Sequence, residues 1–323
     1  MRPLKFHPIL KQPLWGGERI IPYKELASGL SRVGESWELS GMPGSESVVA
    51  EGPWAGSTLS ELIGRFGAEL LGKANYARFG QEFPLLVKFI DAREDLSIQV
   101  HPDDELARKR HGKSGKCEMW YVLEAEPGAS LLTGFSRPIA PAEYERRVAD
   151  NTLTDVLNRQ AIASGDVFYL PAGRVHSIGK GSFIVEIQQS SDITYRIYDF
   201  DRRDAAGNSR ELHTELAREA IDFESSENSR ITYAPENNQE VRLVTTPYFT
   251  TSLYTLTART RCDWSATDSF VAIVLLQGSG SLTDNEGNRI DVRQGETWLL
   301  PASTQWTEIT PHTAPLRLLT SRI

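Results

Sequence analysis

The sequence contains very little cysteine: only Cys117 and Cys262 in 323 residues. Two cysteines are too few for a disulfide framework, and no Cys-x-x-Cys spacing is present that could bind a metal through thiolates. No apolar run approaches the roughly 18 residues that a membrane helix needs, and residues 1–17 lack the continuous apolar stretch of a signal peptide. We therefore expect a cytoplasmic protein that does not interact with membranes.

The sequence also lacks an excess of basic residues. It has 35 Lys and Arg against 43 Asp and Glu, which gives a net charge of -8 at pH 7. Proteins that bind nucleic acids usually carry a basic patch, so we expect no nucleic-acid partner. A local basic pocket can still attract an anion, which leaves a phosphorylated small molecule as a possible substrate. No Gly-rich phosphate loop is present that would indicate a nucleotidyltransferase domain.

Most of the chain has the pattern of short β-strands, with a few helices between them. Thr58 predicts a helix N-cap, because Glu61 follows three residues later and apolar residues then recur at helical spacing to about residue 80. Further helices are predicted over 102–112, within 140–160 and over 211–222. Strands are predicted over 85–90, 120–135 and 165–198, and from 241 to the end.

An internal repeat indicates a duplicated β-domain. Residues 165–172 read GDVFYLPA and residues 295–302 read GETWLLPA, and each follows an apolar strand and a turn with glycine. This string is typical of cupin barrels, in which two sheets fold over each other. We predict a mainly β fold of two cupin-type jelly-roll β-barrels with short inserted helices. The predicted domains are an N-terminal catalytic domain over 1–222, a linker over 223–240 and a C-terminal cupin-like domain over 241–323.

The two copies differ where a metal ligand would lie. Five residues after Pro171 the first copy reaches His176, and the same step from Pro301 reaches Trp306. The only histidine in the second copy is His312, on a turn. We therefore predict that only the N-terminal barrel binds a metal.

Four residues of the N-terminal copy have the chemistry of a metal site. Gln99 and His101 are two apart in an alternating strand, so both side chains leave the same face together with Ser97. Glu118 begins another strand, and His176 follows the turn after Pro171. Nitrogen and oxygen ligands without sulfur suit zinc, and two histidines with a carboxylate also match the iron facial triad.

Several blocks resemble one known family. Residues 96–103 (LSIQVHPD), 115–121 (GKCEMWY), 173–181 (GRVHSIGKG) and 186–199 (EIQQSSDITYRIYD) are similar to the signature blocks of type I mannose-6-phosphate isomerases, in their short bacterial branch. The resemblance covers most of the chain to about residue 201. The last hundred residues resemble the family only in architecture.

The resemblance implies one zinc ion per chain and a set of catalytic residues. The implied zinc ligands are Gln99, His101, Glu118 and His176. The family's active-site arginine corresponds to Arg196, and its lysines correspond to Lys116 and Lys88. The implied reaction interconverts mannose 6-phosphate and fructose 6-phosphate through a cis-enediol.

Further roles follow from the chemistry of this reaction. Lys116 and Arg196 could stabilise negative charge on the sugar or bind its phosphate, and Ser97 could donate a hydrogen bond to the phosphate. We predict Glu186 as the general base, because its strand follows directly from His176. The competing interpretation is that Glu186 is a structural partner of Arg196.

Two other functions share the predicted metal ligands. An iron-dependent cupin dioxygenase would use the histidines and the carboxylate without needing Lys116 and Arg196 beside them. A non-catalytic cupin would bind a phosphosugar without converting it. The isomerase is the main prediction, and both alternatives stay open at the level of sequence.

Overall fold

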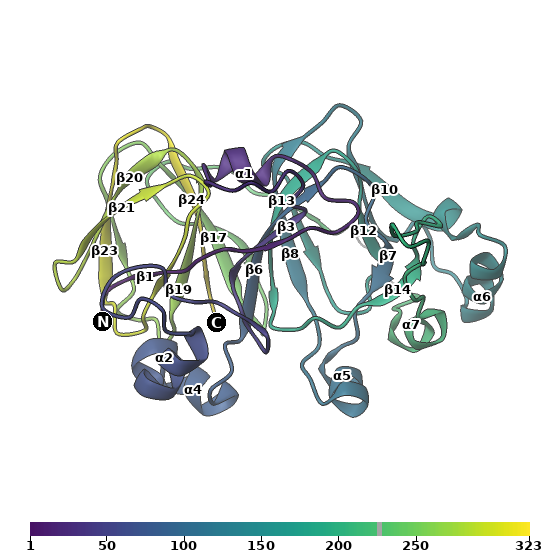
Figure 1. Ribbon diagram of the computed structural model, residues 1–323, viewed down its shortest axis with the longest axis horizontal. Helices are drawn as coiled ribbons and strands as arrows, with labels where there is room; N and C mark the ends of the chain where they lie inside the picture. Colours follow the sequence, from purple (N-terminus) through teal and green to yellow (C-terminus); the bar gives the residue numbers. More distant parts are fainter. Residues whose placement is uncertain (225–227) are drawn as a thin grey trace.

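The computed structural model describes residues 1–224 and 228–323, and it shows two β-rich halves side by side (Figure 1). The N-terminal half contains two sheets that face each other. In strand order, the seven-stranded sheet is β15 (Arg230–Ile231), β11 (Val167–Leu170), β8 (Glu118–Ala125), β13 (Ser182–Gln189), β6 (Leu85–Ala92), β3 (Glu35–Leu39) and β2 (Ile9–Lys11). The five-stranded sheet is β10 (Leu157–Ala161), β9 (Ser130–Phe135), β12 (His176–Ile178), β7 (Ile98–Val100) and β14 (Tyr195–Tyr198).

The C-terminal half repeats this arrangement with fewer strands. Its larger sheet is β1 (Leu4–Lys5), β22 (Thr297–Leu300), β19 (Val271–Gln277), β24 (Leu316–Arg322), β17 (Thr250–Leu256) and β16 (Val241–Thr245). Its smaller sheet is β18 (Thr260–Asp263), β23 (Trp306–Pro311), β20 (Ser279–Asp284) and β21 (Arg289–Arg293). A short hairpin, β4 (Gly41–Met42) and β5 (Ser45–Glu46), lies outside these sheets. The predicted mainly β, jelly-roll fold is confirmed.

The repeat found in the sequence corresponds to the same pair of strands in each half. β11 runs antiparallel to β8, and β22 runs antiparallel to β19. Gly165 and Gly295 precede the repeated strands with positive φ angles of 90° and 80°, a conformation that disfavours residues with a Cβ atom. His176 begins β12 and Trp306 begins β23, so the two residues occupy corresponding places.

The four sheets are stacked in layers, and alternation along each strand determines what each face contacts. In β6, Leu85, Val87 and Phe89 join a large apolar core shared with the C-terminal half, which includes Val274 and Leu319. The alternate residues of the same strand face the five-stranded sheet. The outer face of the five-stranded sheet packs against the helical insert. The interior of the N-terminal half is therefore enclosed by two sheets that are each supported from behind.

The predicted helices are present, with different lengths: α2 (Leu59–Phe66), α3 (Ala68–Leu71), α4 (Lys73–Phe79), α5 (Asp104–His111), α6 (Pro141–Ala149), the 3₁₀ helix η1 (Leu153–Val156) and α7 (Thr214–Ala220). The sequence did not predict the short helix α1 (Ile20–Tyr23), which lies in a segment expected to form strands and loops. The capping box of Thr58 and Glu61 is confirmed at the start of α2. The segment to residue 80 forms three short helices because Gly67 and Gly72, both with positive φ, interrupt it. No helix among the described residues is long and apolar enough to cross a membrane.

Two segments near the boundary between the halves pair with strands that their position in the sequence does not suggest. β1 pairs with β22, so the first strand belongs to the larger sheet of the C-terminal half. β15, in the predicted linker, pairs with β11 and extends the seven-stranded sheet. Residues 225–227 of that linker lie outside the described residues. The division into 1–222 and 241–323 stays a prediction.

Candidate active site

A polar cavity of about 140 Å³ lies between the two sheets of the N-terminal half. Its wall contains six of the residues predicted from sequence, which are Lys88, Ser97, Gln99, Lys116, Glu186 and Arg196. The other lining residues are Trp15, Glu35, Ile90, Leu96, Ile178, Thr194 and Arg210. The predicted site residues therefore converge although they come from segments far apart in the sequence.

Strand register brings the polar residues of the five-stranded sheet together. β7 lies between β12 and β14, and Gln99 is the partner of His176 on one side and of Arg196 on the other. Ser97 lies on the same face, and its hydroxyl donates to Gln99 Oε1 at 3.3 Å. Ile98 and Val100 face the opposite way, into the apolar core beneath the helices. The predicted polar face of this strand is confirmed for Ser97 and Gln99.

Strand register in the seven-stranded sheet likewise brings charged side chains together on the face that lines the cavity. Glu186 on β13 is paired with Lys88 on β6 and with Trp120 on β8. Glu118 lies two residues before Trp120 on β8 and so shares its face. Lys88, Glu118 and Glu186 interrupt strands that are otherwise largely apolar, and all three are buried.

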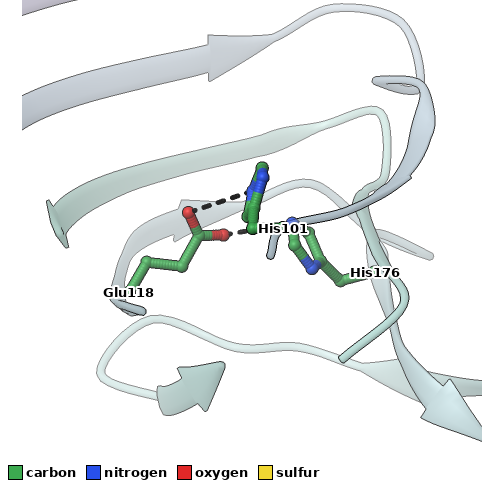
Figure 2. Close-up of side chains that lie close together, drawn as sticks. All are labelled: His101, Glu118 and His176. Carbon is green, nitrogen blue, oxygen red and sulfur yellow. Dashed lines mark ion pairs between the residues drawn. The ribbon is translucent and has the colours of Figure 1, made fainter. Parts of the chain in front are cut away.

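Two histidines and a glutamate form a compact buried cluster (Figure 2). Glu118 Oε1 lies 3.2 Å from His176 Nε2, and Glu118 Oε2 lies 3.5 Å from His101 Nε2. One ligand atom from each of the three residues lies within 4.8 Å of the others. A cluster of two imidazoles and one carboxylate at this spacing could hold a metal ion.

Both imidazoles have the orientation that metal binding requires. The Nδ1 atoms lie 2.8 Å from backbone carbonyl oxygens, of Ile193 for His101 and of Arg174 for His176. A carbonyl only accepts, so each Nδ1 carries the proton and each Nε2 presents a lone pair to the cluster. Burial lowers the pKa of His176 to about 4 and lowers that of His101 well below its ordinary value. Both rings are therefore neutral at pH 7.

The carboxylate of Glu118 is also available to a cation. Both oxygens are buried and accept no hydrogen bond within the described part of the chain. The Lys116 ammonium lies 3.1 Å from Glu118 Oε2 and 3.1 Å from His101 Nε2. Burial raises the pKa of Glu118, and the nearby Lys116 opposes this effect. A buried carboxylate whose neighbours are one ammonium group and two imidazole Nε2 atoms that present lone pairs fits a site that is completed by a metal cation.

Gln99 reaches the same cluster through its amide. Gln99 Nε2 lies 3.4 Å from His176 Nε2, while Oε1 accepts from Ser97. As a metal ligand the amide would present Oε1, which requires rotation of the amide by half a turn. All four predicted ligands are thus brought together, and their donor atoms suit a divalent metal.

The charged pair of Lys88 and Glu186 lies beside the cluster. Lys88 Nζ is 3.0 Å from Glu186 Oε1, and Trp120 Nε1 donates to Glu186 Oε2 at 2.9 Å. Burial would lower the pKa of Lys88, but Glu186 and Glu35 outweigh it and raise that pKa. Burial would raise the pKa of Glu186, but Lys88 and Lys116 outweigh it and lower that pKa. Both groups are therefore charged. The ion-pair partner of Glu186 is Lys88, whereas the structural interpretation of Glu186 from the sequence expected Arg196.

Sequence reasoning missed Arg210 in the cavity wall, although it found Arg196. Arg196 Nη1 donates to the backbone oxygen of Glu211 at 2.9 Å, and its backbone N–H donates to His213 Nδ1 at 3.2 Å. Arg210 lies in the connection between β14 and α7. That connection has no periodic pattern, so no signal in the sequence placed Arg210 near the site.

Comparison with known proteins agrees with this geometry. Residues 4–132 match the model of a family described as phosphomannose isomerase type I, catalytic domain. The chain is 34% identical over 303 residues to a probable mannose-6-phosphate isomerase of Bacillus subtilis, GmuF, and the match covers 93% of each chain. It is 33% identical over 302 residues to the mannose-6-phosphate isomerase of Streptococcus mutans, covering 93% of this chain and 92% of the relative.

Solved structures show the same similarity over the whole chain. The crystal structure of the mannose 6-phosphate isomerase from Bacillus subtilis superposes with a TM-score of 0.90 at 30% identity and covers 100% of both chains. A mutant of phosphomannose isomerase from Salmonella typhimurium has the same fold, with a TM-score of 0.79 at 16% identity and 99% of both chains covered. These relatives favour the isomerase over the dioxygenase and the non-catalytic cupin. The chain therefore belongs to the type I mannose-6-phosphate isomerases, a family of aldose–ketose isomerases.

Proposed function

We propose that this enzyme interconverts mannose 6-phosphate and fructose 6-phosphate through a cis-enediol, with one zinc ion bound per chain. The observation that carries the proposal is a cavity lined by four cationic side chains, two of whose lining residues, Lys116 and Gln99, contact the His101–Glu118–His176 cluster. A phosphorylated sugar needs positive charge at its phosphate, and an enediol intermediate needs positive charge near its oxygens. A dioxygenase would need neither.

The zinc would be held by Gln99, His101, Glu118 and His176. When bound, zinc supplies a Lewis acid that polarises sugar oxygens. Both histidine rings are preorganised for metal binding, because the backbone carbonyls of Ile193 and Arg174 accept from Nδ1 and so leave Nε2 unprotonated. The same ligands would accept ferrous iron, so the identity of the metal must be measured.

The proton transfer requires a base near C1 and C2 of the sugar. The base takes the proton from C2 of mannose 6-phosphate and returns it to C1, while the hydroxyl proton moves between the two oxygens. Glu186 lines the cavity and is ionised, which is the form that a base needs. Its pairing with Lys88 keeps the carboxylate in one orientation and weakens its basicity.

The cations divide into two groups by position. Lys116 lies next to Glu118 and His101, where it can stabilise negative charge that develops on the sugar oxygens. Arg196 lies on β14, beyond Gln99, where its planar guanidinium can bind phosphate oxygens in pairs. The hydroxyl of Ser97 can donate to the same phosphate. The substrate would thus place its reacting end at the cluster and its phosphate at Arg196.

A coupled assay with mannose 6-phosphate tests the proposal. The purified enzyme should form fructose 6-phosphate, lose that activity after treatment with a chelator, and recover it when zinc is restored. Ferrous iron supplied in place of zinc is the matched comparison. Full activity in protein that metal analysis shows to be metal-free would contradict the zinc-dependent reaction.

A further inference from the structure

Arg210 lines the cavity, and the reaction proposed above uses no group of this side chain. Its role rests on the proposed function, because it would bind one end of the proposed substrate. Arg210 lies in the connection between β14 and α7, and its side chain is 34% exposed. It therefore lines the cavity without being fully enclosed.

The side chain of Arg210 is held in one orientation by Asp199. Arg210 Nε donates to Asp199 Oδ2 at 2.8 Å, and Arg210 Nη2 donates to Asp199 Oδ1. Asp199 is buried, and its pKa is lowered by hydrogen bonds from Arg210 and Arg202 that outweigh the effect of burial. Two guanidinium nitrogens are thus used, and Nη1 makes no hydrogen bond within the described part of the chain. A pre-oriented arginine with a remaining donor is suited to bind an anion.

Arg196 adds a second cation with an unused donor. Its Nε atom is buried and has no hydrogen-bond partner in residues 1–224 or 228–323. A buried donor without a partner costs free energy unless a ligand satisfies it. The pKa of Arg196 is lowered first by burial and then by the positive charge of Arg210. An anion that contacts both guanidiniums would remove this repulsion.

The charge balance around the two arginines also favours a bound anion. Arg202 donates to the same carboxylate, Asp199, through Nη2 at 2.6 Å. Asp199 is therefore shared between two guanidiniums and can neutralise only one of them. Arg202 also donates to the backbone oxygen of Asp95 and does not line the cavity. Positive charge remains at the cavity wall on Arg196 and Arg210.

We propose that Arg210 binds the phosphate group of the substrate together with Arg196, and that Asp199 is the positioning residue that orients the Arg210 guanidinium. In this arrangement the two arginines enclose the phosphate from β14 and from the following connection. Arg202 is structural and stabilises that connection through Asp95 and Asp199.

Steady-state kinetics and phosphate binding test the role of Arg210. R210Q should raise the KM for mannose 6-phosphate at least 10-fold, change kcat by a smaller factor, and weaken inhibition by inorganic phosphate to the same extent as KM. R202Q is the matched control, because it also loses a bond to Asp199, and its KM should stay within about threefold of the wild-type value. Metal content and melting temperature are measured for every variant to confirm that each is folded.

Asp199 is tested by combining substitutions. D199N should raise KM, and D199N/R210Q should have the same KM as R210Q alone, since a positioning residue has no effect once the side chain that it positions is gone. A further increase in the double variant would overturn the positioning role. R210Q with a KM and a phosphate inhibition constant like those of R202Q would overturn the role of Arg210.

A calorimetric titration with inorganic phosphate separates this proposal from the proposed function. If the wild-type protein binds phosphate more tightly than R210Q but forms no fructose 6-phosphate, the proposed reaction is wrong and the anion site is retained. If the wild-type protein isomerises the sugar and R210Q binds phosphate equally well, the reaction is retained and the proposal for Arg210 is wrong.

Discussion

Lys88 and Glu186 are paired across neighbouring strands, with Nζ and Oε1 3.0 Å apart inside the N-terminal half. Each ion is buried, so each depends on the other for compensation of its lost hydration. K88M should therefore lower the free energy of unfolding by about 3–5 kcal/mol, because it leaves the Glu186 carboxylate buried without its cation. Urea unfolding followed by circular dichroism measures this value.

The double variant K88M/E186Q is the control for this pair. Glutamine keeps an acceptor for Trp120 Nε1 and removes the uncompensated charge. The double variant should recover most of the stability lost in K88M while remaining catalytically impaired, because both residues line the cavity. Equal stability of K88M and the wild-type protein would show that the pair contributes nothing to folding.

The metal cluster gives the second prediction. If the proposed zinc site is correct, H176A should lower zinc affinity by at least 100-fold, because it removes a proposed ligand whose ring is oriented by the backbone oxygen of Arg174. W306A is the matched control, since Trp306 occupies the corresponding place in the C-terminal half. There the Trp306 ring packs against an arginine, with the ring centroid 4.2 Å from Arg261 Cζ. Metal analysis after dialysis should find zinc in W306A and none in H176A. Loss of zinc from W306A would mean that the metal binds elsewhere.

The convergence of Gln99, His101, Glu118 and His176 could be anticipated from the sequence because several of these residues follow local rules. Alternation along a strand places Ser97 and Gln99 on one face, and the repeated turn of residues 165–172 places His176 at the start of a strand. The mainly β, jelly-roll fold could be predicted for the same reason, because the repeated segments 165–172 and 295–302 can be recognised in the sequence. The capping box of α2 was likewise a local signal.

Contacts between distant segments could not be predicted in this way. The pairing of Glu186 with Lys88 depends on which strands are neighbours in the sheet, and no local pattern gives that order. The place of β1 in the other half depends on how the chain crosses the molecule. Arg210 lies on an irregular connection, and its side chain is held by a hydrogen bond to Asp199. Each of these features is a tertiary relationship without a periodic signature.

The third prediction concerns the contact between α4 and the C-terminal half. Asp268 accepts from the backbone N–H groups of Lys73 and Ala74, so it caps α4 from a loop far away in the sequence. Gly72 lies against this loop with a φ of 92°, and a Cβ atom there would lie 2.2 Å from the Asp268 carbonyl oxygen. G72A should therefore force the two segments apart.

Gly80, at the other end of α4, is the control for this prediction. It also has a positive φ, of 59°, but a Cβ atom there would meet nothing within 4 Å. Gly72 (φ 92°, ψ 154°) and Gly80 (φ 59°, ψ -120°) both have backbone conformations that residues with a Cβ atom rarely adopt, so each alanine variant incurs a backbone penalty of about 1–3 kcal/mol. G72A should lose about 1–3 kcal/mol more than G80A, which is the usual cost of overpacking. Equal losses in urea unfolding would show that the loop with Asp268 moves aside without cost.

The last prediction concerns the buried thiol of Cys262 on β18, in the core of the C-terminal half. Burial raises the pKa of this thiol to about 12. In the unfolded chain the thiol has its ordinary pKa of about 8.5, so above that pH the unfolded state loses a proton that the folded state keeps. The folded state is then disfavoured as pH rises, by about 1.4 kcal/mol per pH unit until the pH approaches the folded pKa.

C262A isolates this contribution, because alanine has no titrating group. The variant should be less stable than the wild-type protein at pH 8, since it leaves a small cavity. Between pH 9 and pH 10 the wild-type protein should lose about 1 kcal/mol more stability than C262A, so the difference between the two proteins narrows. A thiol reagent should label neither Cys262 nor Cys117 in the native protein at pH 8, and both after denaturation, because both are buried. Rapid labelling of Cys262 in the native protein would show that this core opens, and a constant stability difference up to pH 10 would show that the thiol titrates alike in both states.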